Sequence, residues 1–338
     1  MDKRLAHIDF AAGIMIIWMI IYHALCYANV YNVNGEEITN PCLLFPYLSF
    51  FMPWFFYKSG QFFKKRTLRE LWARDSRKLL LTFAIWSAIG YIMYLIFGVV
   101  QNYLTLRGAT YSIVRGLFLT GKIPINEPLW FLTTLFGVRV IANWLLPGMD
   151  EKNGWIKIMG IVFVGYAIAC ICYLMSYRLM PFWVANGASG LAFFAIGYGI
   201  REYEKKWWLI VPCALVYIVC CIVGFPMVDM MYNELLSGNY LLWMPVAACG
   251  IIIFNVLCRL TTKYIRIKPI EKVGQNAMTI YVTHILIVLS VQFVITYFHM
   301  AKLFPYLVQM FIAGYVVFLP ILCYFVPKAP ILVGRLKK

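Results

Sequence analysis

The sequence predicts an all-α, polytopic membrane protein with about ten transmembrane helices and with both termini in the cytoplasm. Hydrophobic residues make up 63% of the 338 residues and charged residues only 13%, whereas soluble domains average about half and about a quarter. The apolar residues gather in runs of roughly the 20 residues that a helix needs to cross a bilayer. Lysine and arginine concentrate in alternate connections between these runs, which gives the expected orientation.

Ten apolar runs follow one another with short polar connections. We place the spans at residues 8–28, 44–63, 79–100, 128–147, 157–177, 185–201, 207–225, 240–258, 276–298 and 304–326. The first run is too long for the apolar core of a signal peptide, and no small-residue cleavage site follows it, so we expect it to remain as a span. Because no long hydrophilic segment interrupts the runs, we expect a single membrane-embedded domain over residues 1–338.

The formal net charge of +16 is explained by membrane topology rather than by a nucleic-acid partner. With the amino terminus inside, 23 of the 30 Lys and Arg residues lie in the predicted cytoplasmic segments and five lie in the external ones. Such an excess on the cytoplasmic side is the usual mark of orientation in multi-pass proteins. We therefore expect contacts with membrane lipids and none with nucleic acid.

The ten cysteines do not indicate a metal site. They form no C-x-x-C pair and no cluster with histidine, and nine of them fall in or beside apolar runs. Small apolar packing residues are the simplest interpretation of such cysteines. We expect no bound metal.

Residues 67–78 are predicted to form an amphipathic helix at the cytoplasmic surface. Arg69, Arg74, Arg77 and Lys78 alternate there with apolar side chains, which suits a helix that lies in the membrane interface. These cations can form a collar that contacts lipid headgroups, or they can bind an anionic cofactor. A second amphipathic piece is predicted around residues 113–119, in the longest external connection.

Two ionisable side chains in the first span suggest chemistry inside the membrane. Asp9 and His23 are 14 residues apart, which on a helix is about 21 Å. Histidine titrates near neutrality and can act as a general base, although a histidine that bonds a neighbouring helix for packing is an equal alternative. Asp9 lies in the first helical turn, where free amide groups stabilise a carboxylate, so capping competes with catalysis as its role.

Two cations also fall inside predicted spans. Lys58 is followed by Ser59 and Gly60, which permit close approach of another backbone, so we interpret this stretch as the wall of a cavity rather than as a lysine that extends to the interface. Arg139 lies mid-span or in the inner half of its span, where a guanidinium is costly unless it faces a cavity or an anion.

Glu127 and His284 have open interpretations. Glu127 stands at the outer mouth of the fourth span at about the depth of His23, where it can orient His23, contact an external substrate or simply be a loop acid. His284 has Tyr281 and Thr283 close to it in sequence. We expect a satisfied polar network there.

Five short motifs follow one another in a characteristic order. They are Arg4-Leu5-Ala6-His7-Ile8-Asp9-Phe10-Ala11-Ala12-Gly13-Ile14 continuing to Tyr22-His23, the 50–60 segment that ends in Ser59-Gly60, the basic-to-apolar 74–80 segment, Leu129-Trp130-Phe131-Leu132, and Val273-Gly274-Gln275-Asn276 running to Tyr281 and His284. Over nearly the whole chain the sequence resembles the acyltransferase-3 family of bacterial integral-membrane acyltransferases. The family carries a cation three residues after the first acid, and here that position is Ala12.

The resemblance implies roles for several residues. His23 is expected to act as a general base or as a transient acyl carrier, with Asp9 and Glu127 as further members of the catalytic site. Lys58 is expected to replace the cation missing at Ala12 and to stabilise the oxyanion. Acetyl-CoA would be the cytoplasmic donor. The residues expected to bind it are Arg74, Arg77, Lys78, Arg139 and Ser59.

The resemblance also implies an acceptor and a location. Members of the family mostly acylate carbohydrate hydroxyls, so the expected acceptor is an extracytoplasmic carbohydrate or a glycolipid, and the expected site is the bacterial cytoplasmic (inner) membrane. Two other functions fit the buried charges. The chain could be a transporter or flippase of a polar substrate, or a catalytically silent receptor or scaffold. Use of acetyl-CoA by the purified protein distinguishes the enzyme from the transporter, and the turnover of a Lys58→Ala variant addresses the silent member.

Overall fold

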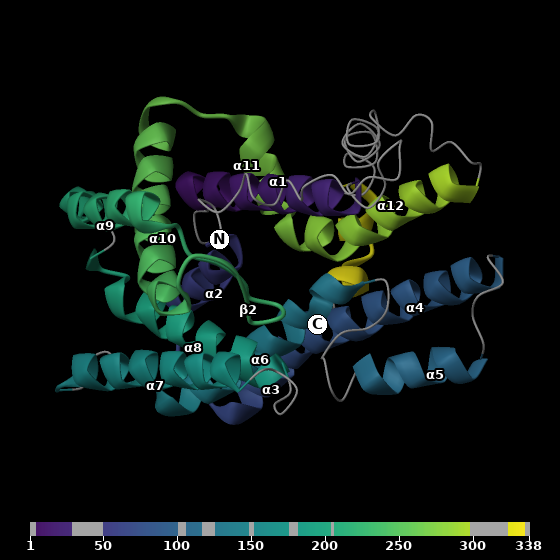
Figure 1. The fold of residues 1–338 in the computed structure, drawn as a ribbon, viewed down its shortest axis with the longest axis horizontal. Coiled ribbons are helices and arrows are strands. Elements are labelled where there is room, and N and C mark those ends of the chain that lie inside the picture. Colours follow the sequence, from purple (N-terminus) through teal and green to yellow (C-terminus); the bar gives the residue numbers. More distant parts are fainter. Residues whose placement is uncertain are drawn as a thin grey trace.

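Helices account for almost all of the chain that the structure describes, as the composition predicts (Figure 1). The computed structural model describes residues 5–28, 50–100, 106–116, 126–148, 152–175, 182–203, 206–297 and 324–334. Six helices in this part are long and apolar enough to cross a membrane, or up to seven if one bent pair is a single span. The prediction of an all-α, multi-pass membrane protein is thus confirmed. The predicted start of the second span (44–49) and nearly all of the last span (304–326) lie outside the described residues.

The first helix, α1 (Ala6–Ala28), packs against the α11–α12 pair, which lies beside it in Figure 1. Helices α11 (Lys268–Gln275) and α12 (Ala277–Tyr297) meet at an angle of 83°. Two glycines let α1 and α11 approach closely. A Cβ atom on Gly13 would lie 2.1 Å from the carbonyl oxygen of Ile270, and one on Gly274 would lie 1.8 Å from that of Asp9. This contact fixes the end of α1 that carries Asp9.

A short central helix, α2 (Phe51–Gln61), is enclosed by its neighbours. Its Trp54, Phe56 and Tyr57 side chains are almost fully buried. Helix α8 (Phe182–Ile200) crosses it at a second glycine contact, since a Cβ on Gly60 would lie 2.0 Å from a carbonyl oxygen of α8. The shortness of α2 and its buried position make it part of the protein core.

The basic segment after α2 does not form a separate interfacial helix. Helix α3 (Leu68–Asp75) starts at a capping box in which Thr67 and Glu70 bond each other's backbone amides at 3.3 Å, an arrangement that satisfies two free donors. It passes through one π-helical turn (Ser76–Leu81) directly into α4 (Thr82–Val100), and together they make one 31-residue apolar candidate span over Leu68–Gly98. The expected surface helix over 67–78 is therefore the first part of a longer helix.

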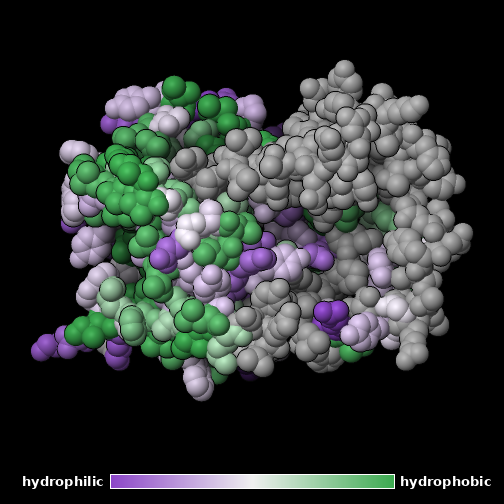
Figure 2. All heavy atoms as spheres, in the orientation of Figure 1, coloured by the Kyte–Doolittle hydropathy of each residue, from purple (hydrophilic) through white to green (hydrophobic). Residues whose placement is uncertain are grey.

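The remaining helices complete the bundle, and α7 and α8 lie side by side in Figure 1. They are α5 (Leu106–Arg115), α6 (Trp130–Leu145), α7 (Gly154–Leu174), α9 (Ile210–Val223) and α10 (Tyr240–Tyr264), with short 3₁₀ turns at Glu127–Leu129, Trp207–Leu209, Val326–Lys328 and Pro330–Val333. Figure 2 shows hydrophobic side chains covering the surface over α9 and α10, as expected for helices that face lipid.

A β-hairpin joins α9 to α10. Strands β1 (Met227–Asp229) and β2 (Glu234–Ser237) pair antiparallel. The turn between them includes Asn233 in the left-handed conformation, with φ of 55°, which asparagine adopts more readily than most residues. The hairpin occupies the connection that the sequence places on the external side.

Candidate functional site

Two histidines from opposite ends of the sequence meet inside the protein. His23 lies towards the carboxyl end of α1, and His284 lies in the first half of α12, fully buried. The Nε2 atom of His284 is 3.2 Å from Nδ1 of His23. The same Nδ1 atom is 3.0 Å from the carbonyl oxygen of Met19, and Nδ1 of His284 is 2.7 Å from that of Tyr281.

These contacts assign the protons of the neutral pair. Because a carbonyl oxygen can only accept, Nδ1 of His284 carries the proton that it donates to Tyr281, and its Nε2 is left as an acceptor. Nδ1 of His23 faces two acceptors, Met19 and His284, so it carries a proton as well. A neutral imidazole holds one proton, so Nε2 of His23 keeps its lone pair. The arrangement leaves that nitrogen as a base.

His23 lines a cavity of about 70 Å³. This volume holds a few water molecules or a small substituent. The walls come from α1, α2, the start of α6, α12 and the hairpin. The lining residues are Met19, Tyr22, His23, Phe51, Met52, Pro128, Trp130, Met227, Val228, Asp229, Met230, Met231, Leu236 and Tyr281. The mostly apolar lining lowers the local polarity around the imidazole, which strengthens any electrostatic interaction made there.

The hairpin forms one side of this cavity and is held in place by named contacts. Asp229 accepts hydrogen bonds from the backbone amides of Met231 and Tyr232 at 2.8 and 3.3 Å, which shapes the turn. The Asn233 amide donates to the carbonyl oxygen of Ala169 in α7 at 3.2 Å, and the Tyr240 hydroxyl donates to Asn233. The strands therefore sit over the cavity as a fixed wall rather than as a loose loop.

Glu127 stands just outside the cavity. Its carboxylate accepts a hydrogen bond from the hydroxyl of Tyr232 in the hairpin at 3.3 Å. The next residue, Pro128, lines the cavity and accepts a hydrogen bond from the Tyr281 hydroxyl. The orienting position on His23 that Glu127 could have filled is occupied by His284. Glu127 is thus placed at the mouth, beside the hairpin.

Lys58 lies deeper in the protein, seven residues along α2 from Phe51, which lines the cavity. That separation corresponds to about 10 Å of helix. The side chain is buried at 7% exposure, its ammonium group donates to Gln61 at 2.8 Å, and it lies 5.8 Å from the centre of the Trp54 ring. Lys58 is not one of the described residues that line the His23 cavity. The cation and the histidine pair occupy different levels of the bundle.

Arg139 and Ser59, both expected to bind acetyl-CoA, lie in contact with each other, and the carboxylate of Asp75 also contacts Arg139. The Arg139 guanidinium donates to Asp75 at 2.6 Å and to the Ser59 hydroxyl at 3.1 Å. Asp75 has 4% of its side chain exposed and Arg139 has 20%. Charge-assisted bonds of this length are strong, so Asp75 already compensates most of the Arg139 charge.

The other expected donor-site cations lie near this pair. Arg74 is close enough to Arg139 and Asp75 to feel both charges. Arg77 and Lys78 are exposed on the π-helical turn that follows. Together Arg74, Arg77 and Lys78 form an exposed cationic surface on the segment that the sequence predicts to be cytoplasmic, which suits an anionic ligand.

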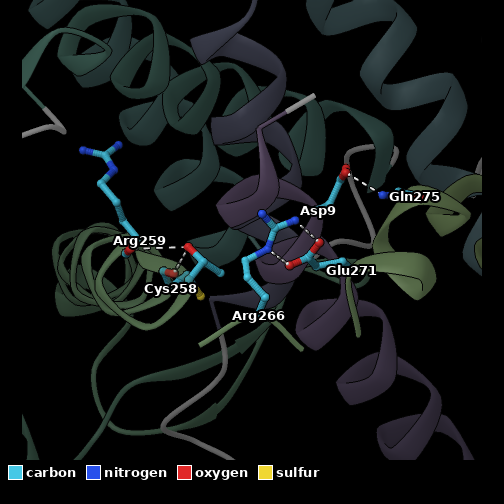
Figure 3. A network of polar contacts seen from close by, with 7 residues as sticks. Asp9, Cys258, Arg259, Arg266, Glu271 and Gln275 are labelled. Carbon is cyan, nitrogen blue, oxygen red and sulfur yellow. Dashed lines mark hydrogen bonds and ion pairs between the residues drawn. The ribbon is translucent and has the colours of Figure 1, made fainter. Parts of the chain in front are cut away.

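Asp9 lies at the other end of α1 from His23. Gln275 in α11 donates to its carboxylate at 3.1 Å, and close by Arg266 forms two bonds of 2.6 and 2.7 Å with Glu271 (Figure 3). With about 21 Å of helix between Asp9 and His23, the geometry gives Asp9 a part in docking α11 on α1. In the described part of the chain, no group of three or more His, Cys, Asp or Glu side chains could hold a metal ion.

Sequence reasoning missed three features of the site. His284 was expected in a polar network, but its partnership with His23 spans 261 positions and leaves no local pattern. Asp75 gave a weak signal, as an acid within a run of cations. Asp229 gave none, because only the fold places the hairpin against the cavity.

Comparison with known families agrees with this architecture. A family model described as an acyltransferase domain, of the acyltransferase-3 type, matches residues 5–325. The match covers α1, which carries His23, and α12, which carries His284. No curated protein and no solved structure matches the chain.

Proposed function

Because the chain belongs to the acyltransferase-3 family of membrane acyltransferases, we propose that it moves an acetyl or other short acyl group from cytoplasmic acyl-CoA to a hydroxyl of an extracytoplasmic or lipid-linked carbohydrate. The observation that carries the proposal is the histidine pair, which leaves Nε2 unprotonated on His23, a residue that lines a small, largely apolar cavity. A positioned base of this kind typically contributes a factor of about 10² to 10⁴ to the rate.

In direct transfer, His23 Nε2 takes the proton of the acceptor hydroxyl while its oxygen attacks the thioester carbonyl carbon. The C–O bond forms, the tetrahedral intermediate collapses with cleavage of the C–S bond, and the imidazolium returns its proton to the thiolate. The products are the acylated acceptor and coenzyme A. In the alternative route, Nε2 attacks the thioester carbonyl carbon and the C–S bond breaks, so the coenzyme A thiolate leaves and an acylimidazolium forms on His23. The acceptor hydroxyl then attacks the acyl carbon, the N–C bond breaks to restore the neutral imidazole, and the hydroxyl proton goes to the thiolate.

His284 supports either route through His23. By accepting from Nδ1 of His23 it holds the ring in the tautomer that exposes a base at Nε2. When His23 becomes cationic, the same contact stabilises the added charge, because Nδ1–H then donates a stronger bond. His284 is therefore a positioning residue in this proposal.

We assign the donor to the cationic end of the bundle. Arg74, Arg77 and Lys78 are exposed there and match the phosphates of coenzyme A in charge and hydrogen-bonding geometry. Arg139, already paired with Asp75, would organise this end together with Ser59. We assign oxyanion stabilisation to Lys58. Because it lies about 10 Å of helix from the level of Phe51 in the cavity, its flexible side chain has to turn from Gln61 towards the histidines to meet the thioester oxygen.

We assign the acceptor to the hairpin side. Glu127 stands beside the His23 cavity and Asp229 is among the residues that line it. Carboxylates accept hydrogen bonds from sugar hydroxyls. The positive-inside pattern puts this side outside the cytoplasm. An inner-membrane enzyme that modifies a surface or lipid-linked glycan satisfies both assignments.

The experiment is thiol release from acetyl-CoA by the purified full-length protein in detergent, with and without a membrane-glycan extract as acceptor source. We expect glycan-dependent release, and an increase of several degrees in unfolding temperature with coenzyme A. If the protein shows no thiol release and is not stabilised by coenzyme A, the result favours the transporter and contradicts the enzyme.

A further inference from the structure

A second, much larger cavity lies away from the histidines, as a groove between α6, α7 and α8. It measures about 890 Å³ and shares no described lining residue with the His23 cavity. This volume is in the range of sites that hold drug-sized or lipid-sized ligands. Nearly all of its lining is apolar, the polar exceptions being Thr133, Thr134 and Lys157. Its chemistry is that of a hydrocarbon site.

The groove is open on the outside of the bundle. Ile141, Val164 and Trp183, one from each of the three helices, line it and are 48%, 55% and 52% exposed. Apolar side chains this exposed on long apolar helices face the hydrocarbon of a bilayer. A ligand can therefore enter sideways from the membrane.

Three glycines in the groove have no packing reason to be glycine. A Cβ atom added to Gly137, Gly160 or Gly187 would meet nothing within 4 Å. In contrast, one added to Gly165 would lie 2.8 Å from the carbonyl oxygen of Ala188. A glycine inside a helix costs about 1 kcal/mol relative to alanine. At the three open positions no close helix contact compensates this cost in stability. The missing side chains keep the groove wide.

A charge stands at one end of the groove. Lys157, in the first turn of α7, lines it, and the positive-inside pattern places this end on the cytoplasmic side. From Lys157 to Ile168 the groove follows about 16 Å of α7, close to half of the roughly 30 Å hydrocarbon core. The groove thus has the length of one leaflet, with a cation at headgroup depth.

We propose that this groove binds a phospholipid of the cytoplasmic leaflet, with one acyl chain between α6, α7 and α8 and the headgroup phosphate at Lys157. An ammonium group attracts a phosphate at the membrane surface, and apolar area buried along the chain adds about 25 cal/mol per Å². The site is independent of the acyl-transfer chemistry at His23.

The test is native mass spectrometry of the full-length protein in detergent after incubation with dioleoyl phosphatidylglycerol. Gly160→Leu and, on another helix, Gly187→Leu add bulk to the groove at positions where a Cβ atom meets nothing within 4 Å. If one variant fails to fold, the other still tests the site. Cys221→Leu adds bulk at an exposed position on α9 as the control. Lys157→Gln removes the charge, and Lys263→Gln removes an exposed cation of α10.

We expect one retained phospholipid per chain in the wild type and in both controls, at least tenfold less in the glycine variants, and at least fivefold weaker binding in Lys157→Gln. Retention that is equal in all variants would overturn the site. Binding of a polyprenyl phosphate in place of phosphatidylglycerol would overturn the choice of occupant.

Discussion

His284 Nε2 lies 3.2 Å from His23 Nδ1, and together with the Met19 carbonyl oxygen it leaves Nε2 of His23 as the nitrogen that can act as a base. Nδ1 of His23 also contacts the Met19 carbonyl oxygen, and Nδ1 of His284 contacts that of Tyr281. The tautomers of both rings therefore follow from their hydrogen-bond partners. In other catalytic sites, too, a third group orients the base by a hydrogen bond.

The first prediction concerns His284. Replacing it with leucine leaves His23 Nδ1 with the Met19 carbonyl alone. The ring then loses its second acceptor, which holds its orientation and stabilises the imidazolium, so kcat for thiol release should fall about tenfold or more. His284→Gln keeps a carbonyl oxygen as acceptor and should restore part of the rate. Steady-state thiol release by both variants, at equal folded fraction, checks this. Equal kcat in the leucine and glutamine variants would remove the positioning role.

The second prediction concerns the buried ion pair. Asp75→Leu or Arg139→Leu leaves one charge without its partner, and each should lower the free energy of unfolding by about 3 kcal/mol. The double variant Asp75→Leu with Arg139→Leu should lose less than the sum of the two, because no unpaired charge remains. Thermal unfolding in detergent measures all three. Strict additivity would contradict a direct coupling.

The third prediction concerns glycine packing. Gly60→Ala puts a methyl group 2.0 Å from the Phe194 carbonyl oxygen, so α2 and α8 must separate, and the expected loss of stability is about 1 to 3 kcal/mol. Gly137→Ala meets nothing within 4 Å and should stabilise by about 0.5 to 1 kcal/mol. The two variants differ by the same single methyl, so unfolding temperatures that move in the same direction would contradict the packing described here.

The fourth prediction concerns the hairpin wall. Asn233→Gly keeps the left-handed backbone but removes the bonds to Ala169 and Tyr240, so the wall should loosen and admit water. Hydrolysis of acetyl-CoA should rise severalfold relative to transfer, and the acceptor KM should increase more than kcat falls. Comparing thiol release with acylated product measures this ratio. An unchanged ratio would mean that the hairpin does not exclude water.

The sequence was sufficient for the fold class and the family, because both depend on features that accumulate along the chain. Apolar runs predicted the helices, and five ordered motifs predicted the family that the whole-chain match confirms. The continuous helix from Leu68 to Gly98 was missed because a basic, amphipathic start looks the same on an interfacial helix and on the inner end of a span.

The site was predicted only in part. His23 could be singled out because a titratable group in hydrocarbon is unusual by itself. Its pairing with His284 and the position of Asp229 depend on contacts between distant segments, which no local spacing encodes. The roles of Lys58, Glu127 and Asp9 stay predictions. Glu127 lies beside the His23 cavity, whereas Lys58 and Asp9 are about 10 and about 21 Å of helix away from the level of the cavity.

The most direct measurement is thiol release from acetyl-CoA by His23→Ala beside the wild type, both purified as the full chain. Removing the base should lower the rate by at least about 100-fold, while the unfolding temperature and its increase with coenzyme A stay within a few degrees of the wild type. A His23→Ala protein that retains most of the wild-type rate would contradict catalysis at this histidine.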